Sequence, residues 1–148
     1  MSDYYIRFIP ESINTTLGVN SIKLVEKLDW GGNVPKFTFN EQLHFADAGQ
    51  NFESVECPLC KANLMEWWGS AMGSAYSDVE GFINIEVTAP CCSMKVSLHN
   101  LEYSFPQGFY KTMIEVMPRL DNQVVPEDIA DNLLDITGEK WRVIHAYY

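Results

Sequence analysis

The sequence predicts an α+β fold, and three observations lead to this prediction. Several segments alternate apolar and polar residues with the period of a β-strand, whereas others repeat apolar residues at helical spacing. Outside the middle of the chain, the expected elements follow the order strand, helix, strand twice over. Right-handed crossovers make a ferredoxin-like α/β sandwich the simplest arrangement of that order. The middle contains four cysteines in two clusters, which predict an inserted metal-binding subdomain.

The first half is expected to contain a strand, a helix and a second strand. The first run alternates and stops at Pro10, as a short strand does. Ile22, Val25 and Leu28 recur at helical spacing before Gly31, which predicts a short helix. Apolar residues then alternate with polar ones, as expected for a strand with one buried face. The expected ranges are residues 4–9, 21–29 and 37–45.

The middle segment is predicted to be a zinc ribbon. A helix is expected after the first cysteine pair. One strand is expected before the second pair and one strand after it. A strand, a tight turn and a second strand are how a zinc ribbon presents a ligand pair. The expected ranges are residues 62–76 for the helix and 83–88 and 94–98 for the strands. Residues 52–101 are therefore assigned to an inserted zinc-ribbon subdomain, within a single domain of residues 1–148.

The second half repeats the order of the first. The run from Tyr110 to Val116 alternates, and although its apolar residues also fit a helical period, we favour a strand. Pro126 opens a helix in its first turn, where the missing N–H costs nothing, and Gly138 ends it. A last alternating run predicts a strand over residues 141–147.

The four cysteines are predicted to bind one Zn²⁺ ion. Cys57 and Cys60 belong to a C-P-L-C motif, while Cys91 and Cys92 are adjacent and follow a predicted strand. Zinc accepts four thiolates in a tetrahedron. Because adjacent cysteines must reach one ion through a tighter geometry, His99 is the alternative ligand in place of one of them. Reduced thiols without a metal, or a redox pair, are the other interpretations.

The sequence predicts no catalytic residue. Four sulfur ligands close a zinc site, so no position remains where a water molecule can bind and ionise. The phosphate-binding, dinucleotide-binding and nucleophile-elbow motifs are absent. His44, His99 and His145 are dispersed along the chain, and none has an acidic neighbour that would mark a general base.

The charge of the chain favours a basic protein as partner. The formal net charge is −10, and four zinc-bound thiolates with their ion would take it to about −12. The ten basic residues are scattered, so nucleic acid is a disfavoured partner. The acidity also keeps a small protein soluble.

A cytoplasmic location is expected. No apolar run approaches the ~20 residues that a membrane span needs. The first five residues, Met1 to Tyr5, lack the basic and apolar pattern of a signal peptide. A reducing compartment favours free or metal-bound thiols over disulfides.

Trp67 and Trp68 have two interpretations. They either seal the ribbon against the main sheet or form an exposed binding patch, and packing is the favoured of the two. An exposed tryptophan pair would make a strong anchor for a partner.

Four short stretches resemble a group of short, uncharacterised bacterial zinc-ribbon-containing proteins. The likeness extends over about residues 55–117, and it implies zinc on the cysteines and no established activity. The stretches are the C-P-L-C motif at Cys57, the sequence Trp67-Trp68-Gly69, the sequence Pro90-Cys91-Cys92 and the run from Ser97 to Phe109.

These observations together predict a non-enzymatic, zinc-stabilised acidic binding module that docks a protein partner, as a regulator, an inhibitor or an immunity-type protein. A nucleic-acid-associated zinc ribbon is the alternative. A dithiol redox protein that uses Cys57 and Cys60 is less favoured, because Glu56 lies beside Cys57 and a neighbouring carboxylate raises the pKa of a thiol.

Overall fold

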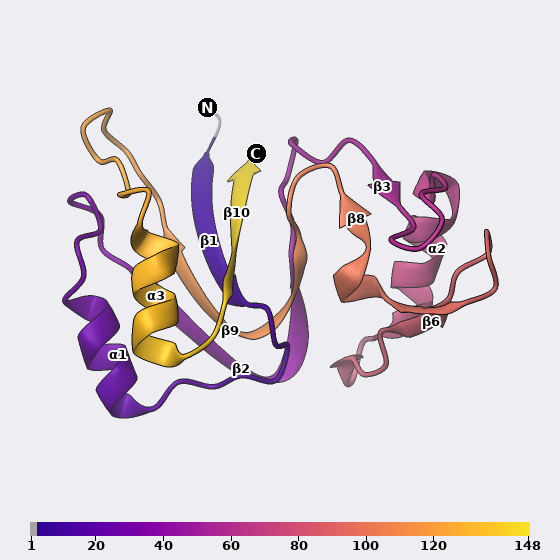
Figure 1. Cartoon of the computed structure of the whole chain (residues 1–148), viewed down its shortest axis with the longest axis horizontal. Coiled ribbons are helices and arrows are strands. Elements are labelled where there is room, and N and C mark those ends of the chain that lie inside the picture. The colour runs from indigo at the N-terminus through magenta and orange to yellow at the C-terminus, as the bar shows by residue number, and fades with distance from the viewer. Residues whose placement is uncertain (1–2) are drawn as a thin grey trace.

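Four long strands make up most of the larger sheet, in the order β10-β1-β9-β2, and each neighbouring pair is antiparallel (Figure 1). The computed structural model describes residues 3–148 and combines this sheet with α-helices, so the fold is α+β as predicted. The four strands are β1 (Tyr4–Pro10), β2 (Lys36–Ala46), β9 (Gly108–Val116) and β10 (Trp141–Tyr147).

Helices α1 (Val19–Glu26) and α3 (Ile129–Thr137) lie side by side on one face of this sheet (Figure 1). Their apolar sides pack on sheet residues that are fully or almost fully buried, among them Phe8 and Ile114. Gly138 ends α3 with φ of +75°, a left-handed conformation that glycine adopts at little cost.

The predicted strands and helices of both halves are present, and the ends of all but the last strand are shifted. The predicted strand at Tyr110–Val116 is confirmed over the helical alternative. Both faces of β9 are buried, which explains why its apolar pattern fits two periods. The last helix begins at Ile129, three residues later than the predicted start at Pro126.

The middle segment (residues 55–103) builds a second core on the other side of the sheet (Figure 1). Its helix begins only at Met65, because Asn63 pairs with Glu56 in a β-bridge instead of entering the helix. Strands β4 and β5 were not predicted, and β5 extends the larger sheet beyond β2. The elements are β3 (Val55–Glu56), α2 (Met65–Ala75), β4 (Tyr76–Ser77), β5 (Gly81–Phe82), β6 (Glu86–Thr88), β7 (Lys95–Ser97), the 3-10 turn Leu98–Asn100 and β8 (Glu102–Tyr103).

The middle segment closes on itself at its two ends. Strands β3 and β8 pair with each other, and the N–H of Ser104 donates to the C=O of Ser54. Strands β6 and β7 form a separate two-stranded hairpin.

No helix within residues 3–148 is both long and apolar enough to cross a membrane. The expectation that the chain lacks a signal peptide involves Met1 and Ser2, which lie outside the described residues.

His99 connects the middle segment to the larger sheet. Its side chain is buried, and its Nδ1 accepts a hydrogen bond from the N–H of Phe109 at 2.9 Å. The ring proton therefore resides on Nε2, which donates to the C=O of Glu11 at 3.0 Å. Burial, together with the nearby Arg142 guanidinium, lowers the pKa of His99 to about 4. His99 is thus a neutral bridge between two backbone segments.

Arg142 completes this connection. Its Nη1 donates to the C=O of His99 at 2.9 Å and to the C=O of Gln107. Its Nε and Nη2 donate to the two carboxylate oxygens of Glu11, at 3.0 and 2.7 Å. A Cβ at Gly108 would lie 2.6 Å from the same Nη1, so only glycine fits there. We refer to Glu11, His99, Gln107, Gly108 and Arg142 as the joint.

The neutral state of His99 predicts that stability decreases in mild acid. The folded protein takes up this proton only near pH 4, whereas an unfolded histidine takes it up near pH 6.5. The free energy of unfolding should therefore fall as the pH drops from about 6.5 to about 4, by up to about 3 kcal/mol from this group. Urea denaturation across this range measures the fall.

A His99→Gln variant serves as the comparison, because it cannot take up the proton. Acid also releases any bound metal from both proteins alike, so the difference between the two pH profiles isolates His99. Parallel profiles for the two proteins would contradict the prediction.

Candidate metal centre

Two tight turns bring the four cysteines together. The first turn (residues 57–61) follows β3, and the second turn (residues 89–93) connects β6 to β7. The Sγ atoms of Cys57 and Cys92 are 3.9 Å apart, and those of Cys60 and Cys91 are 3.2 Å apart. All four Sγ atoms lie within 4.8 Å of one another. The four predicted residues therefore form one cluster.

The two turns have the same backbone. In the first, the N–H of Lys61 donates to the C=O of Cys57, and in the second, the N–H of Ser93 donates to the C=O of Ala89, both at 2.9 Å. Lys61 and Ser93 have φ of 65° and 61°, a conformation that non-glycine residues rarely adopt. Ala89 is thus the counterpart of Cys57, and both are fully buried.

The same position-by-position correspondence applies to the other cysteines. Cys92 is the counterpart of Cys60, whereas Cys91 is the counterpart of the exposed Leu59. The two cysteines of the first turn are its first and fourth residues, whereas those of the second turn are its third and fourth residues. Pro58 and Pro90 occupy matching positions, so the A-P-C-C and C-P-L-C sequences already contained a signal of this shift.

The arrangement fits a tetrahedral ion with four sulfur ligands. With metal–sulfur bonds of about 2.3 Å, the edges of such a tetrahedron measure about 3.8 Å. The separations in the cluster lie on both sides of this value. Cys57 is buried at its base, whereas Cys60 and Cys91 are exposed. A metal held here is within reach of solvent on one side only.

The pKa values of two of the thiols are shifted in opposite directions. Hydrogen bonds from the N–H groups of Cys60 and Leu59 lower the pKa of Cys57 to about 7, against the effect of burial. Hydrogen bonding with Cys60, together with partial loss of hydration, raises the pKa of Cys91 to about 12. Four thiols at these distances cannot all ionise without a cation among them. A divalent, thiophilic metal removes this penalty.

His99 is not a ligand in this cluster. The cluster consists of the four cysteines, and both ring nitrogens of His99 are already engaged in the joint. Its predicted role as an alternative to one cysteine is therefore wrong. The reason is that the 3-10 turn at Leu98–Asn100 directs the ring toward Glu11 and Phe109, which sequence spacing does not reveal.

Trp67 and Trp68 are partly buried, and both pack against the core of the middle segment. Trp68 lies among Phe45, Phe52 and Tyr103, and its Nε1 donates to the hydroxyl of Tyr103 at 3.2 Å. The favoured interpretation as packing residues is confirmed for Trp68. Trp67 also lines a groove between α2 and β6.

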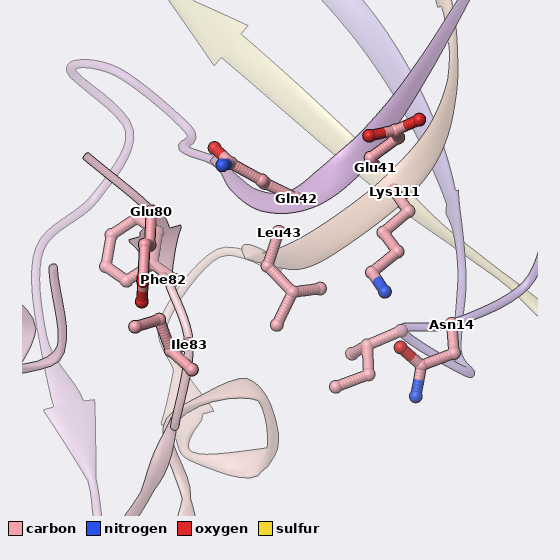
Figure 2. Close-up of a pocket in the computed structure, with 9 residues that line it drawn as sticks. Asn14, Glu41, Gln42, Leu43, Glu80, Phe82, Ile83 and Lys111 are labelled. Carbon is pink, nitrogen blue, oxygen red and sulfur yellow. The ribbon is translucent and has the colours of Figure 1, made fainter. Parts of the chain in front are cut away.

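A pocket of about 410 Å³ lies between the larger sheet and the middle segment (Figure 2). Leu43 points into it, and its charged groups are Glu41, Glu80 and Lys111. Its lining contains no cysteine, histidine or serine.

Comparisons of the chain with protein-family models, curated proteins and solved structures find no match. The resemblance to bacterial zinc-ribbon-containing proteins stays a prediction, and the geometry of the residues carries the interpretation of the site.

The equivalence of the two turns predicts that the thiolate of Cys91 can be replaced by a thiolate at position 89. A Cys91→Ser variant should lose metal affinity by at least about a hundredfold, because a thiolate ligand is removed. Adding Ala89→Cys to it creates a second C-x-x-C turn, which should restore the affinity to within about tenfold of the wild type. Competition with a chromophoric chelator measures both. No recovery in the double variant would show that the position of Ala89 does not face the ion.

Proposed function

We propose that this protein is a non-enzymatic, metal-stabilised acidic binding module that docks a protein partner with a basic surface. The observation that carries the proposal is the convergence of four thiols from two matched turns onto one point. Four thiolates complete the coordination shell of a tetrahedral metal ion, so no open position remains for a substrate. Its purpose is then stability of the middle segment.

We take the scaffold to be a ferredoxin-like α/β sandwich with a zinc ribbon inserted between its halves. The strand order β10-β1-β9-β2, with both helices on one face, supports the first part. The hairpin β6–β7 and the bridge between Glu56 and Asn63, each of which encloses a cysteine turn, support the second.

Zinc is the metal that fits best. Four thiolates in a tetrahedral arrangement select zinc or iron among the common metals, and a closed mononuclear site of this type is usual for structural zinc. The thiolates Cys57, Cys60, Cys91 and Cys92 would hold the ion, and the bound metal would link the two turns.

The partner is inferred from charge. The net charge of −10 disfavours nucleic acid and favours a basic protein surface. In the middle segment, no lysine or arginine occurs between Lys61 and Lys95. The exposed acidic residues of this stretch are Glu66, Asp78, Glu80 and Glu86.

Two measurements test the proposal. Elemental analysis of the natively purified protein should find one zinc per chain. The immobilised, metal-loaded chain should retain a basic protein at low salt and release it at high salt, since contacts between exposed charges are screened. Metal-free protein that remains fully folded, or retention of nucleic acid in place of a protein, would contradict it.

A further inference from the structure

The groove between α2 and β6 combines a free strand edge with a floor of small residues. It has a volume of about 420 Å³, and β6 lies alongside α2 in Figure 1. The helix contributes Ser70, Ala71, Ser74 and Ala75, with Trp67 at one end. Small side chains leave room for another chain between the helix and the strand.

The edge of β6 that faces this groove carries unpaired backbone groups. Within residues 3–148, β6 pairs only with β7. Hydrogen bonds in an antiparallel pair involve every second residue, and here they use Ile85, Val87 and Ala89. The backbone groups of Glu86 and Thr88 therefore point away from β7. The N–H of Glu86 donates to Asn84 Oδ1, which leaves the C=O of Glu86 and both groups of Thr88 free.

An exposed strand edge of this kind recruits another extended chain, since the added strand satisfies the free N–H and C=O groups. The charge around the groove selects that chain. Glu86 is the one charged residue that lines the groove, and no lysine or arginine occurs from residue 62 to residue 94. On the other side of β6, Lys95 of β7 is the register partner of Thr88.

A second copy of this chain is a poorer occupant. Pairing of β6 with its own copy would bring together two strand edges that both carry Glu86. Each copy also has a net charge of −10. Like charges in contact oppose such an association.

We propose that the groove between α2 and β6 binds an extended peptide segment rich in lysine or arginine, which adds as a strand to the edge of β6. This inference rests on the proposed function and identifies its docking surface. The backbone of the peptide pairs with Glu86 and Thr88, and its basic side chains approach Glu86.

The test uses the metal-loaded full chain and a labelled peptide of alternating lysine and valine, with binding followed by fluorescence anisotropy. Thr88→Pro removes the free N–H without touching a bond to β7, and should weaken binding at least tenfold. Thr88→Val keeps the N–H and should stay within about twofold of the wild type. A peptide of alternating glutamate and valine should not bind.

Ser74→Trp provides a second blocking variant on the exposed side of α2, in case Thr88→Pro perturbs the hairpin. Three results would each overturn the inference. The blocked variants could bind the lysine peptide as tightly as the wild type, or the wild type could fail to bind it. The wild type could also form a dimer that Thr88→Pro dissociates. The proposed function fails separately, when the metal-loaded wild type retains no basic protein. Retention of that protein by both the wild type and Thr88→Pro would refute only the groove.

Discussion

A Cys57→Ser variant is expected to lose its metal and to unfold the middle segment. Cys57 is fully buried at the base of the cluster, and its Sγ lies 3.9 Å from that of Cys92. The strands β3, β6, β7 and β8 have only two or three residues each, so they form little structure without the metal. Structural zinc contributes roughly 10–16 kcal/mol of apparent binding free energy in small peptides.

Hydrogen exchange and elemental analysis measure this loss. Amides within residues 55–103 should exchange rapidly in the variant, while those of β1, β9 and β10 stay protected. Leu59→Ser is the matched control, because Leu59 belongs to the same turn, is 57 % exposed and is not a ligand. A Cys57→Ser protein that is metal-free and retains protection throughout the middle segment would refute a structural role of the metal.

An Arg142→Met variant is expected to lower the free energy of unfolding by about 3 kcal/mol. The main cost is the loss of charge-assisted hydrogen bonds to the C=O groups of His99 and Gln107, which leaves both without this donor. The ion pair with Glu11 adds less, because the Glu11 side chain is 44 % exposed to water.

Urea denaturation compares this variant with two others. Arg142→Lys keeps the charge but not the planar fork of donors, so it should show most of the same loss. Arg119→Met removes an exposed arginine and should change the stability by no more than about 0.5 kcal/mol. If Arg142→Lys matched the wild type, charge and not hydrogen-bond geometry would hold the joint together.

The joint also gives a physical role to the run from Ser97 to Phe109. Ser97 Oγ accepts from the N–H of His99, and the Tyr103 hydroxyl donates to the C=O of Leu98 at 2.6 Å. Ser104 Oγ accepts from the N–H groups of Glu53 and Ser54. This run returns the chain from the cysteine cluster to β9, and its polar residues hold that path in place.

Local patterns in the sequence predicted most of the elements. Alternation and helical spacing arise from the geometry of a single strand or helix, so they indicated β1, β2, β10, α1 and α3 within a few residues. Tertiary pairing decides where an element starts. The bridge between Glu56 and Asn63 is why α2 begins later than predicted. The short β4 and β5 carry no detectable period, because two residues cannot show one.

The sequence by itself determined the alternation of strands and helices and the identity of the four clustered cysteines, because both follow from residue type and local spacing. Only the tertiary structure decided how distant segments meet. It placed Glu11 against Arg142 and directed the ring of His99 toward Glu11 and away from the four cysteines. It also put Ala89 at the position in the second turn that corresponds to Cys57 in the first. It also left one edge of β6 open beside α2. These outcomes depend on strand register and on the packing of two cores, and neither is encoded in the spacing of neighbouring residues.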